Sequence, residues 1–373
     1  MDEIARRRGG LRPWTRRGPV LLLLVLLLIV VGLVHASLVA AQTAGSGATG
    51  CETSAAATMA WQSTEGRDHP LVGAVLDTAV GATMPWPVFA SVFADKLARA
   101  SPAILLGEVH DNPDHHAQRA ALIGRSACAR AGDPMSGAAS PGAAVFEHIR
   151  ADQQPALDTF AAVASSKTAD LMRLLDWDNG GWPSQRMFAP LFDAVIAARW
   201  PILAGDPPRR QVRALARGEA GAVPTDERAR LRLDEALPPA LRDALSAELK
   251  GSHCGMLPDA AITGLAAAQQ YRDAHLADAM LAAAEKHGAA VLLAGNGHVR
   301  SDRGVPWHIR QRAPGRQILT VMFVEVEDGV TDARAYVPRA PDDTPAADFV
   351  IFTPRASRSD PCEQMRSMKA GRG

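Results

Sequence analysis

The chain has 373 residues, of which 47% are hydrophobic and 5% aromatic, so it can bury a large core. Lysine plus arginine and aspartate plus glutamate number 40 each, and this balance argues against nucleic acid or another polyanion as a partner. Once the unusual N-terminus is set aside, length and composition favour a single α/β domain of catalytic size.

The first 41 residues differ from the rest of the chain. Six arginines lie before residue 20, and an apolar stretch without Asp, Glu, Lys or Arg runs from Val20 to Ala41. This order is typical of an export signal, with cleavage sites after Ala36 or Ala41, but the stretch is also long enough to cross a bilayer uncleaved. We therefore expect an exported protein, periplasmic or anchored to the inner membrane, that meets the membrane only through residues 1–41.

Four cysteines follow this segment, and none of them has CxxC spacing: Cys51, Cys128, Cys254 and Cys362. An even number of cysteines in an oxidising compartment predicts two disulfides, with three pairings open. We expect a flexible leader over residues 42–80, an α/β domain over 81–355 and a C-terminal tail over 356–373.

Alternating strand and helix patterns fill the domain. Strands are expected in PAILLGE (102–108), AAVFEH (143–148), PILAGD (201–206), AAVLLAGNGH (289–298) and QILTVMFVEV (317–326), and later edge strands in ARAYVP (333–338) and DFVIFTP (348–354). Residues 151–270, poor in strand signals apart from PILAGD, are expected to build a helical cap over one end of the sheet. The alternation predicts an α/β fold with a largely parallel central sheet flanked by helices.

Four of these strands release acidic or imidazole groups at their carboxyl ends. They are Glu108 with His110, Glu147 with His148, Asp206, and His298 with Arg300 just beyond it. In an open parallel sheet the carboxyl ends lie on one edge, and ligand sites form in the crevice outside them. The sequence thus predicts one crevice that gathers these side chains.

Two of the strand ends share the pattern Gly-x-x-His, at Gly107 to His110 and at Gly295 to His298. Each glycine allows a sharp turn or a close backbone approach, so that the imidazole points back over the sheet edge. A helix is expected from Pro113, with Asn112 as its N-cap. On that helix His115 is predicted to face the crevice, whereas His116, about 100° further round, turns away.

A second informative helix is predicted after Pro258. Gln269 and Asp273 fall inside its apolar stripe and Arg272 at the margin, so they either brace the histidine loops or face the crevice. Tyr271 and His275 lie on the opposite face and are expected to be exposed.

The motifs GEVHDNPDHH, FEH, WDNGGWP, HCGMLP, AQQYRDAHLADAM and GNGHVRSDRGVP occur in this order. Together they resemble the ChaN-like family of haem-binding uptake proteins, over roughly residues 80–325. That family is similar in fold to the Tiki, TraB and erythromycin esterase group. The resemblance implies an exported α/β protein with a helical cap, a role in haem or iron acquisition, and homodimers that form around haem.

Two function classes stay open. In a haem carrier the cofactor-binding candidates are His110, His115, Tyr271, Arg272, His298 and Arg300, with Tyr271 favoured for a tyrosinate ligand because it lies inside a matched motif. In a metal-dependent hydrolase, the catalytic and metal-ligating candidates are Glu108, His110, Glu147 and His298, with Asp206, Gln269 and Asp273 orienting them.

Overall fold

The computed structural model describes residues 60–99, 102–131, 142–163 and 167–370. The predicted export segment and Cys51 lie outside these ranges. Within them, no helix combines the length and apolar character that crossing a membrane requires.

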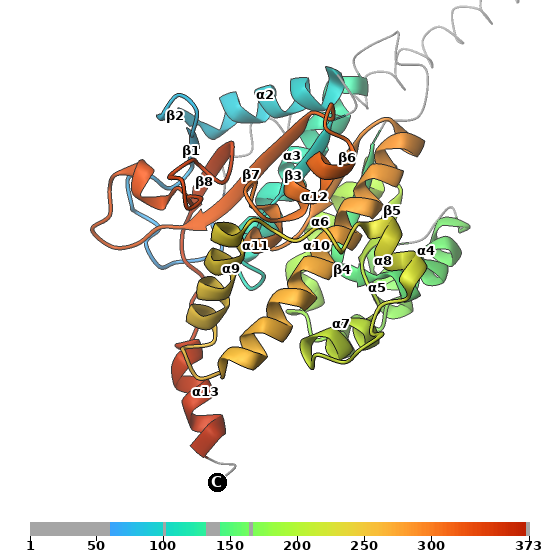
Figure 1. Ribbon diagram of the computed structural model, residues 1–373. Helices are drawn as coiled ribbons and strands as arrows, with labels where there is room; N and C mark the ends of the chain where they lie inside the picture. Colours follow the sequence, from blue (N-terminus) through green and yellow to red (C-terminus); the bar gives the residue numbers. More distant parts are fainter. Residues whose placement is uncertain (1–59, 100–101, 132–141, 164–166, 371–373) are drawn as a thin grey trace, which may run out of the picture. The chain divides into compact units, whose positions relative to one another are not determined.

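Eight strands form one sheet in the order β2-β1-β8-β7-β3-β6-β4-β5 (Figure 1). The six strands from β8 to β5 run parallel, and the β1–β2 hairpin pairs antiparallel with β8. This arrangement confirms the predicted α/β fold with a largely parallel sheet. The bounds are β1 (Ala74–Asp77), β2 (Ala82–Pro85), β3 (Ala103–Leu106), β4 (Ala143–Arg150), β5 (Ile202–Asp206), β6 (Ala290–Leu293), β7 (Ile318–Glu325) and β8 (Phe349–Thr353).

Helices cover both faces of the sheet because successive strand residues point to opposite sides. Ile104 and Phe146 pack into one core, beneath α2 (Trp86–Arg99), α3 (Pro113–Ala131), α4 (Gln154–Ala161), α5 (Thr168–Leu174) and α6 (Gln185–Ala197). Leu105 and Val145 pack into the other core, against α10 (Asp259–His287) and α12 (Val305–Arg312). The long α10 crosses this second face diagonally in Figure 1.

The region predicted as a helical cap divides between two places. Its first half, through α6, covers a face of the sheet, whereas α7 (Arg209–Ala216), α8 (Thr225–Leu231) and α9 (Pro239–Ser252) pack around α10. Short elements complete the chain: η1 (Ala151–Gln153), η2 (Trp177–Asn179), α11 (Asn296–Val299), η3 (Ala333–Tyr336) and α13 (Pro361–Ala370).

Three predictions about the edges of the domain are wrong. β1 falls within the stretch expected to be a flexible leader, and because it pairs with β8, DFVIFTP is an interior strand. ARAYVP forms the 3-10 helix η3, in which the Tyr336 hydroxyl donates to the carbonyl of Val330.

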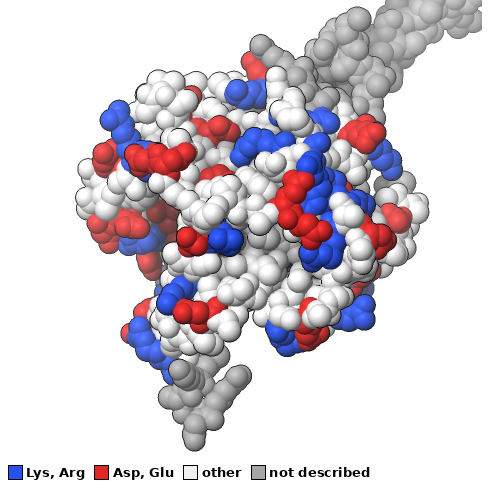
Figure 2. All heavy atoms as spheres, viewed as in Figure 1, with Lys and Arg blue, Asp and Glu red and all other residues white. Residues whose placement is uncertain are grey.

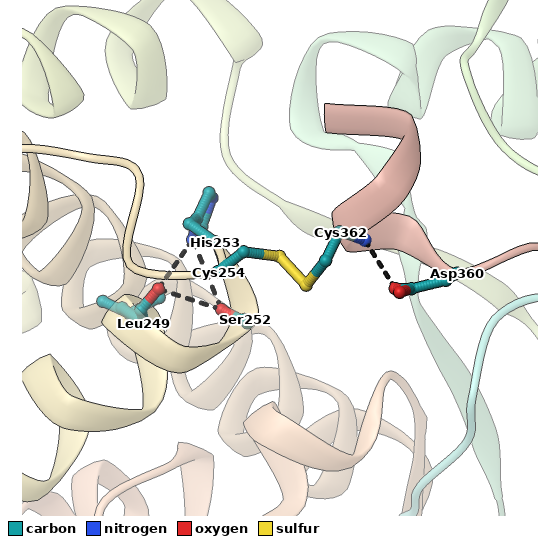
Figure 3. Close-up of a disulfide and its surroundings, with 6 residues drawn as sticks. All are labelled: Leu249, Ser252, His253, Cys254, Asp360 and Cys362. Atoms are coloured by element: carbon teal, nitrogen blue, oxygen red, sulfur yellow. Dashed lines mark hydrogen bonds between the residues drawn. A yellow bond between two sulfur atoms is a disulfide. The ribbon is translucent and has the colours of Figure 1, made fainter. Parts of the chain in front are cut away.

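The predicted C-terminal tail carries α13, which contains Cys362. This cysteine forms a disulfide with Cys254 (Figure 3). Cys51 and the side chain of Cys128 lie outside the described part, so the second predicted disulfide stays a prediction.

The contact between α10 and the end of α7 depends on Gly264. A methyl group at this position would lie 2.2 Å from the carbonyl oxygen of Ala216. We predict that Gly264→Ala lowers the free energy of unfolding by about 1–3 kcal/mol through overpacking, measured by denaturant unfolding. Gly124→Ala in α3 is the matched control, because a methyl group there meets no atom within 4 Å and should raise helix stability by up to about 1 kcal/mol. Equal stability of the two variants would contradict this account of the packing.

Candidate functional site

The carboxyl ends of β3, β4 and β6 meet at a cleft of about 390 Å³. Strand-end loops and α10 supply most of its polar lining: Glu108, His110, Glu147, Gln269, Arg272, Asp273 and His298. Leu245, Glu248 and Leu249 of α9 form the opposite wall. The predicted crevice is therefore present, and seven of the candidate residues line it.

The two Gly-x-x-His loops pack against each other because they follow β3 and β6, which are neighbouring strands with Leu106 paired to Leu293. The backbone N–H of Asn296 donates to the carbonyl of Glu108 at 2.9 Å. A methyl group at Gly107 would lie 2.1 Å from Oδ1 of Asn296, and one at Gly295 would lie 3.0 Å from the His110 ring. Close approach, rather than a left-handed turn, is what these glycines provide.

One half of the site is built on the buried carboxylate of Glu147. Its Oε2 accepts from the backbone N–H of Gly295 at 2.7 Å, and its Oε1 lies 2.8 Å from the Arg272 guanidinium and 3.2 Å from Nε2 of His298. Burial alone would raise the pKa of Glu147, but the positive charges around it hold the pKa well below its ordinary value. Glu147 is therefore ionised.

His298 lies between two carboxylates. Its Nδ1–H donates to Asp273 at 2.6 Å, the Gln269 amide lies 3.0 Å from the same nitrogen, and its Nε2 faces Glu147. Burial would lower the pKa of His298, but the charges of Glu147 and Asp273 outweigh it and raise the pKa to about 10. His298 is therefore a buried imidazolium whose two N–H groups face Asp273 and Glu147.

Arg272 joins this cluster to β5. Its Nε donates to Asp206 at 2.7 Å while its other end holds Glu147. Burial raises the pKa of Asp206, although the guanidinium opposes that shift. Asp206 thus contacts Arg272, and Gln269 and Asp273 contact His298, while their bracing roles stay predictions.

The other half of the site is built on Glu108. Its Oε1 lies 2.6 Å from Nδ1 of His110 and 2.8 Å from Nε2 of His148, and its Oε2 pairs with the fully buried Arg119 and lies 3.2 Å from Nδ1 of His116. Burial keeps the pKa of His148 well below its ordinary value and lowers that of His116 to about 4. Both imidazoles are neutral near pH 7.

Glu108, His110 and His148 together could hold a metal ion. One ligand atom from each lies within 4.8 Å of the other two. Carboxylate and neutral imidazole ligands suit manganese, iron or zinc. Trp182 covers this group, with its ring 5.0 Å from that of His110 and 4.6 Å from that of His148.

His115 and Arg300 do not line the cleft, so their predicted positions are wrong. His115 is fully buried behind the loop, where its Nδ1 accepts from the N–H of Val109 and its Nε2 bonds Thr353 of β8. The helix face is thus rotated from the predicted one, and His116 reaches Glu108 instead. Arg300 pairs with Asp302.

Tyr271 was predicted to be exposed, but only 1% of it is accessible, because α7 and α8 cover that face of α10. Its hydroxyl lies 3.0 Å from carboxylate and amide oxygens of Glu227 and Gln211. Burial and the neighbouring carboxylate raise its pKa far above the ordinary value. His275 donates from Nδ1 to the carbonyl of Gly205.

Sequence reasoning did not assign roles to His148, His116 or Arg119. His148 follows Glu147 at a strand end, and strand alternation sends the two side chains to opposite faces. His116 and Arg119 lie three residues apart on α3, so they share one face. These spacings are the signals that could have placed them in the site.

We predict that Asp273→Asn lowers the pKa of His298 from about 10 toward its ordinary value of 6.5, because one of its two carboxylates is lost. An NMR pH titration of the imidazole measures this shift. Glu248→Gln, in the same cleft but paired with Arg303, is the control and should leave it unchanged. A His298 pKa that stays near 10 in the Asp273 variant contradicts the electrostatic account.

The raised pKa also sets a pH window for stability. The pairing of His298 contributes fully below its unfolded pKa of about 6.5 and is lost as the pH rises through about 10. Between about pH 6.5 and about pH 10, the free energy of unfolding should fall by more in the wild-type chain than in the Asp273→Asn variant.

Comparison with known proteins places this arrangement in a family. The family model "Haem-binding uptake, Tiki superfamily, ChaN" matches residues 93–309. The solved structure of ChaN from Campylobacter jejuni, described with cofacial haem binding, is similar with a TM-score of 0.56 and 18% identity, covering 74% of this chain and 95% of that one. This likeness concerns the fold.

Two further solved structures are weakly similar. A Bacillus cereus protein has a TM-score of 0.27 and 13% identity over 64% of this chain and 75% of its own. A mutant of the erythromycin esterase EreC in its open conformation has a TM-score of 0.38 and 14% identity over 84% and 88%. No curated protein matches the chain. The family match spans both Gly-x-x-His loops and more than half of the residues, so the chain belongs to the ChaN family of haem-binding uptake proteins within the Tiki superfamily.

Proposed function

We propose that this chain is an exported haem-binding protein that serves haem or iron acquisition. The observation that carries the proposal is the family match, since residues 93–309 include every strand and helix that builds the cleft. Haem needs an axial ligand and apolar surface for the porphyrin.

His110 fits the axial position. Its side chain is 39% exposed, whereas those of His116, His148 and His298 are at most 5% exposed. Its Nδ1 is held by Glu108, while its Nε2 lies 3.9 Å from Glu147, beyond hydrogen-bonding distance. Partial burial lowers the pKa of His110, which favours the neutral, ligating form. Trp182, Leu245 and Leu249 supply apolar surface nearby.

Tyr271 fits less well, because its hydroxyl is engaged with Glu227 and its raised pKa disfavours the phenolate. Bound haem would supply redox-active iron to the cleft. The chain's own part is to present His110 through Glu108, in a loop that Gly107 and Gly295 allow to pack closely against its neighbour.

Haemin titration of the purified full chain tests this proposal. We predict a saturable Soret shift that is lost in His110→Ala, because the axial nitrogen is removed, and retained in the controls His287→Ala and Tyr271→Phe. The melting temperature of each variant shows whether it is folded. An unaltered titration in folded His110→Ala would remove His110 from the proposal.

Export is supported by the arginine-rich start and the apolar stretch, and a disulfide such as Cys254–Cys362 suits an oxidising compartment. Alkaline phosphatase fused to the C-terminus should be active in a bacterial host, and it should become inactive when residues 1–41 are deleted. Activity that does not depend on this segment would contradict the proposed export route.

The group of Glu108, His110 and His148 favours a second candidate, a metal-dependent hydrolase. A divalent ion held there would supply Lewis acidity and an activated water. His298, protonated near pH 7 and 3.2 Å from Glu147, would place a positive charge beside negative charge that develops in the cleft. Asp273 orients this imidazolium through its hydrogen bond from Nδ1.

For this candidate we predict about one equivalent of manganese, iron or zinc per chain by mass spectrometry of the untreated protein. Glu108→Gln and His148→Ala should each lose it, since each removes a ligand. His116→Ala, which removes a neighbour of Glu108 outside the ligand group, should retain it. Substoichiometric metal in the wild-type chain would dismiss the hydrolase candidate and leave the haem proposal standing.

A further inference from the structure

A second cavity, of about 520 Å³, lies between α8, α9, α10 and α12. It is separate from the cleft, although α9 and α10 contribute to both. Gln269 and Arg272 of α10 line the cleft, while the intervening Gln270 and Tyr271 line the second cavity. Leu245 of α9 lines both and forms a partition between them.

One part of the wall of this cavity is apolar. Leucine and alanine side chains make up much of the lining, among them Leu215, Leu233, Leu237 and Ala266. The charged residues in the lining are two arginines and two acids, Arg228, Arg242, Glu235 and Asp243, so their formal charges cancel. Figure 2 likewise shows acidic and basic side chains interspersed over this view of the molecule. The lining therefore gives no net attraction to an anion or a cation.

Two polar groups in the lining lack partners. The Nε2 atoms of Gln270 and His308 are buried, and neither has a hydrogen-bond partner among the described residues. His308 is only 3% exposed, and burial lowers its pKa to about 3, so its ring is neutral. Unpaired buried polar groups are costly, so a cavity bordered by two of them is suited to a ligand that supplies a hydrogen-bonding atom.

We propose that this cavity binds an uncharged, largely apolar small molecule that carries one hydrogen-bonding oxygen, such as a medium-chain alcohol. The apolar walls receive the hydrocarbon part. The oxygen accepts from the Gln270 amide or pairs with the His308 imidazole after a side-chain adjustment. An ionised ligand is disfavoured, because burying its charge among balanced charges brings no net pairing. The site is independent of the Glu and His cleft and of haem.

The test uses the purified full chain and the neutral fluorescent probe N-phenyl-1-naphthylamine. Saturable fluorescence enhancement is expected, and 1-octanol should displace the probe at about tenfold lower concentration than octanoate or octylamine. Equal displacement by either charged compound overturns the proposed ligand class. Absence of saturable probe binding overturns the site.

Matched variants locate the binding. Ala267→Trp fills the cavity from an exposed position on α10 and should abolish the displaceable signal, whereas Ala260→Trp, exposed on the same helix but outside the lining, should retain it. Equal signals from the two tryptophan variants would place the probe elsewhere and contradict the proposal. The double variant His110→Ala/His298→Ala should bind the probe like the wild type, which separates this site from the proposed haem function.

His308→Leu and Gln270→Leu test the role of the unpaired groups. Each should weaken 1-octanol displacement about tenfold more than it weakens probe binding, because the probe depends mainly on the apolar walls. Having two variants guards against one that does not fold. Unchanged octanol displacement in both folded variants overturns the assignment of the polar groups.

Discussion

The site depends on one buried carboxylate, that of Glu147. It is held by the N–H of Gly295, the guanidinium of Arg272 and the imidazole of His298, which come from the loop after β6, from α10 and from α11. A buried charge is tolerated only when it is paired and hydrogen-bonded, so these elements must stay together for the fold to be stable. The same pairing keeps His298 protonated and Arg272 fixed. The stability of this edge of the sheet and the charge state of the cleft therefore have a common origin.

The cleft is divided into two electrostatic environments. Around Glu147, cations gather and the imidazole of His298 carries a charge. Around Glu108, burial leaves the imidazoles of His116 and His148 neutral and resistant to protonation, and a neutral imidazole can accept a hydrogen bond or bind a metal. His110 lies between the two carboxylates, at 2.6 Å from Glu108 and 3.9 Å from Glu147. A ligand bound to His110 would therefore lie close to both electrostatic environments.

Much of the fold and of the cleft could be predicted from the sequence, because the residue patterns that determine them are local. Short apolar runs that end in Gly-x-x-His fix the strand, the turn and the direction of the imidazole together, and the parallel sheet then gathers Glu108, Glu147 and His298 at one edge. The side chains on the long helix were also placed well, since the helical period fixes which of Gln269, Arg272 and Asp273 share a face.

The parts that were not predicted depend on tertiary contacts. Whether His115 or His116 reaches Glu108 is decided by how the first turn of α3 packs against Thr353, far away in sequence. Tyr271 is buried because α7 and α8 cover it. The sequences of these two helices do not indicate that they pack against α10. The β1–β2 hairpin joins the sheet by pairing with β8, which is far away in sequence, and β8 is interior because β1 pairs with it.

The central claim is that the cleft binds haem through His110. Electron–nuclear double resonance of the ferric haem complex, prepared with ¹⁵N-labelled histidine, tests it most directly. We expect an axial ¹⁵N coupling in the wild-type chain that disappears in His110→Ala. An oxygen-ligated spectrum in the wild type, or a ¹⁵N coupling that persists in His110→Ala, would contradict it.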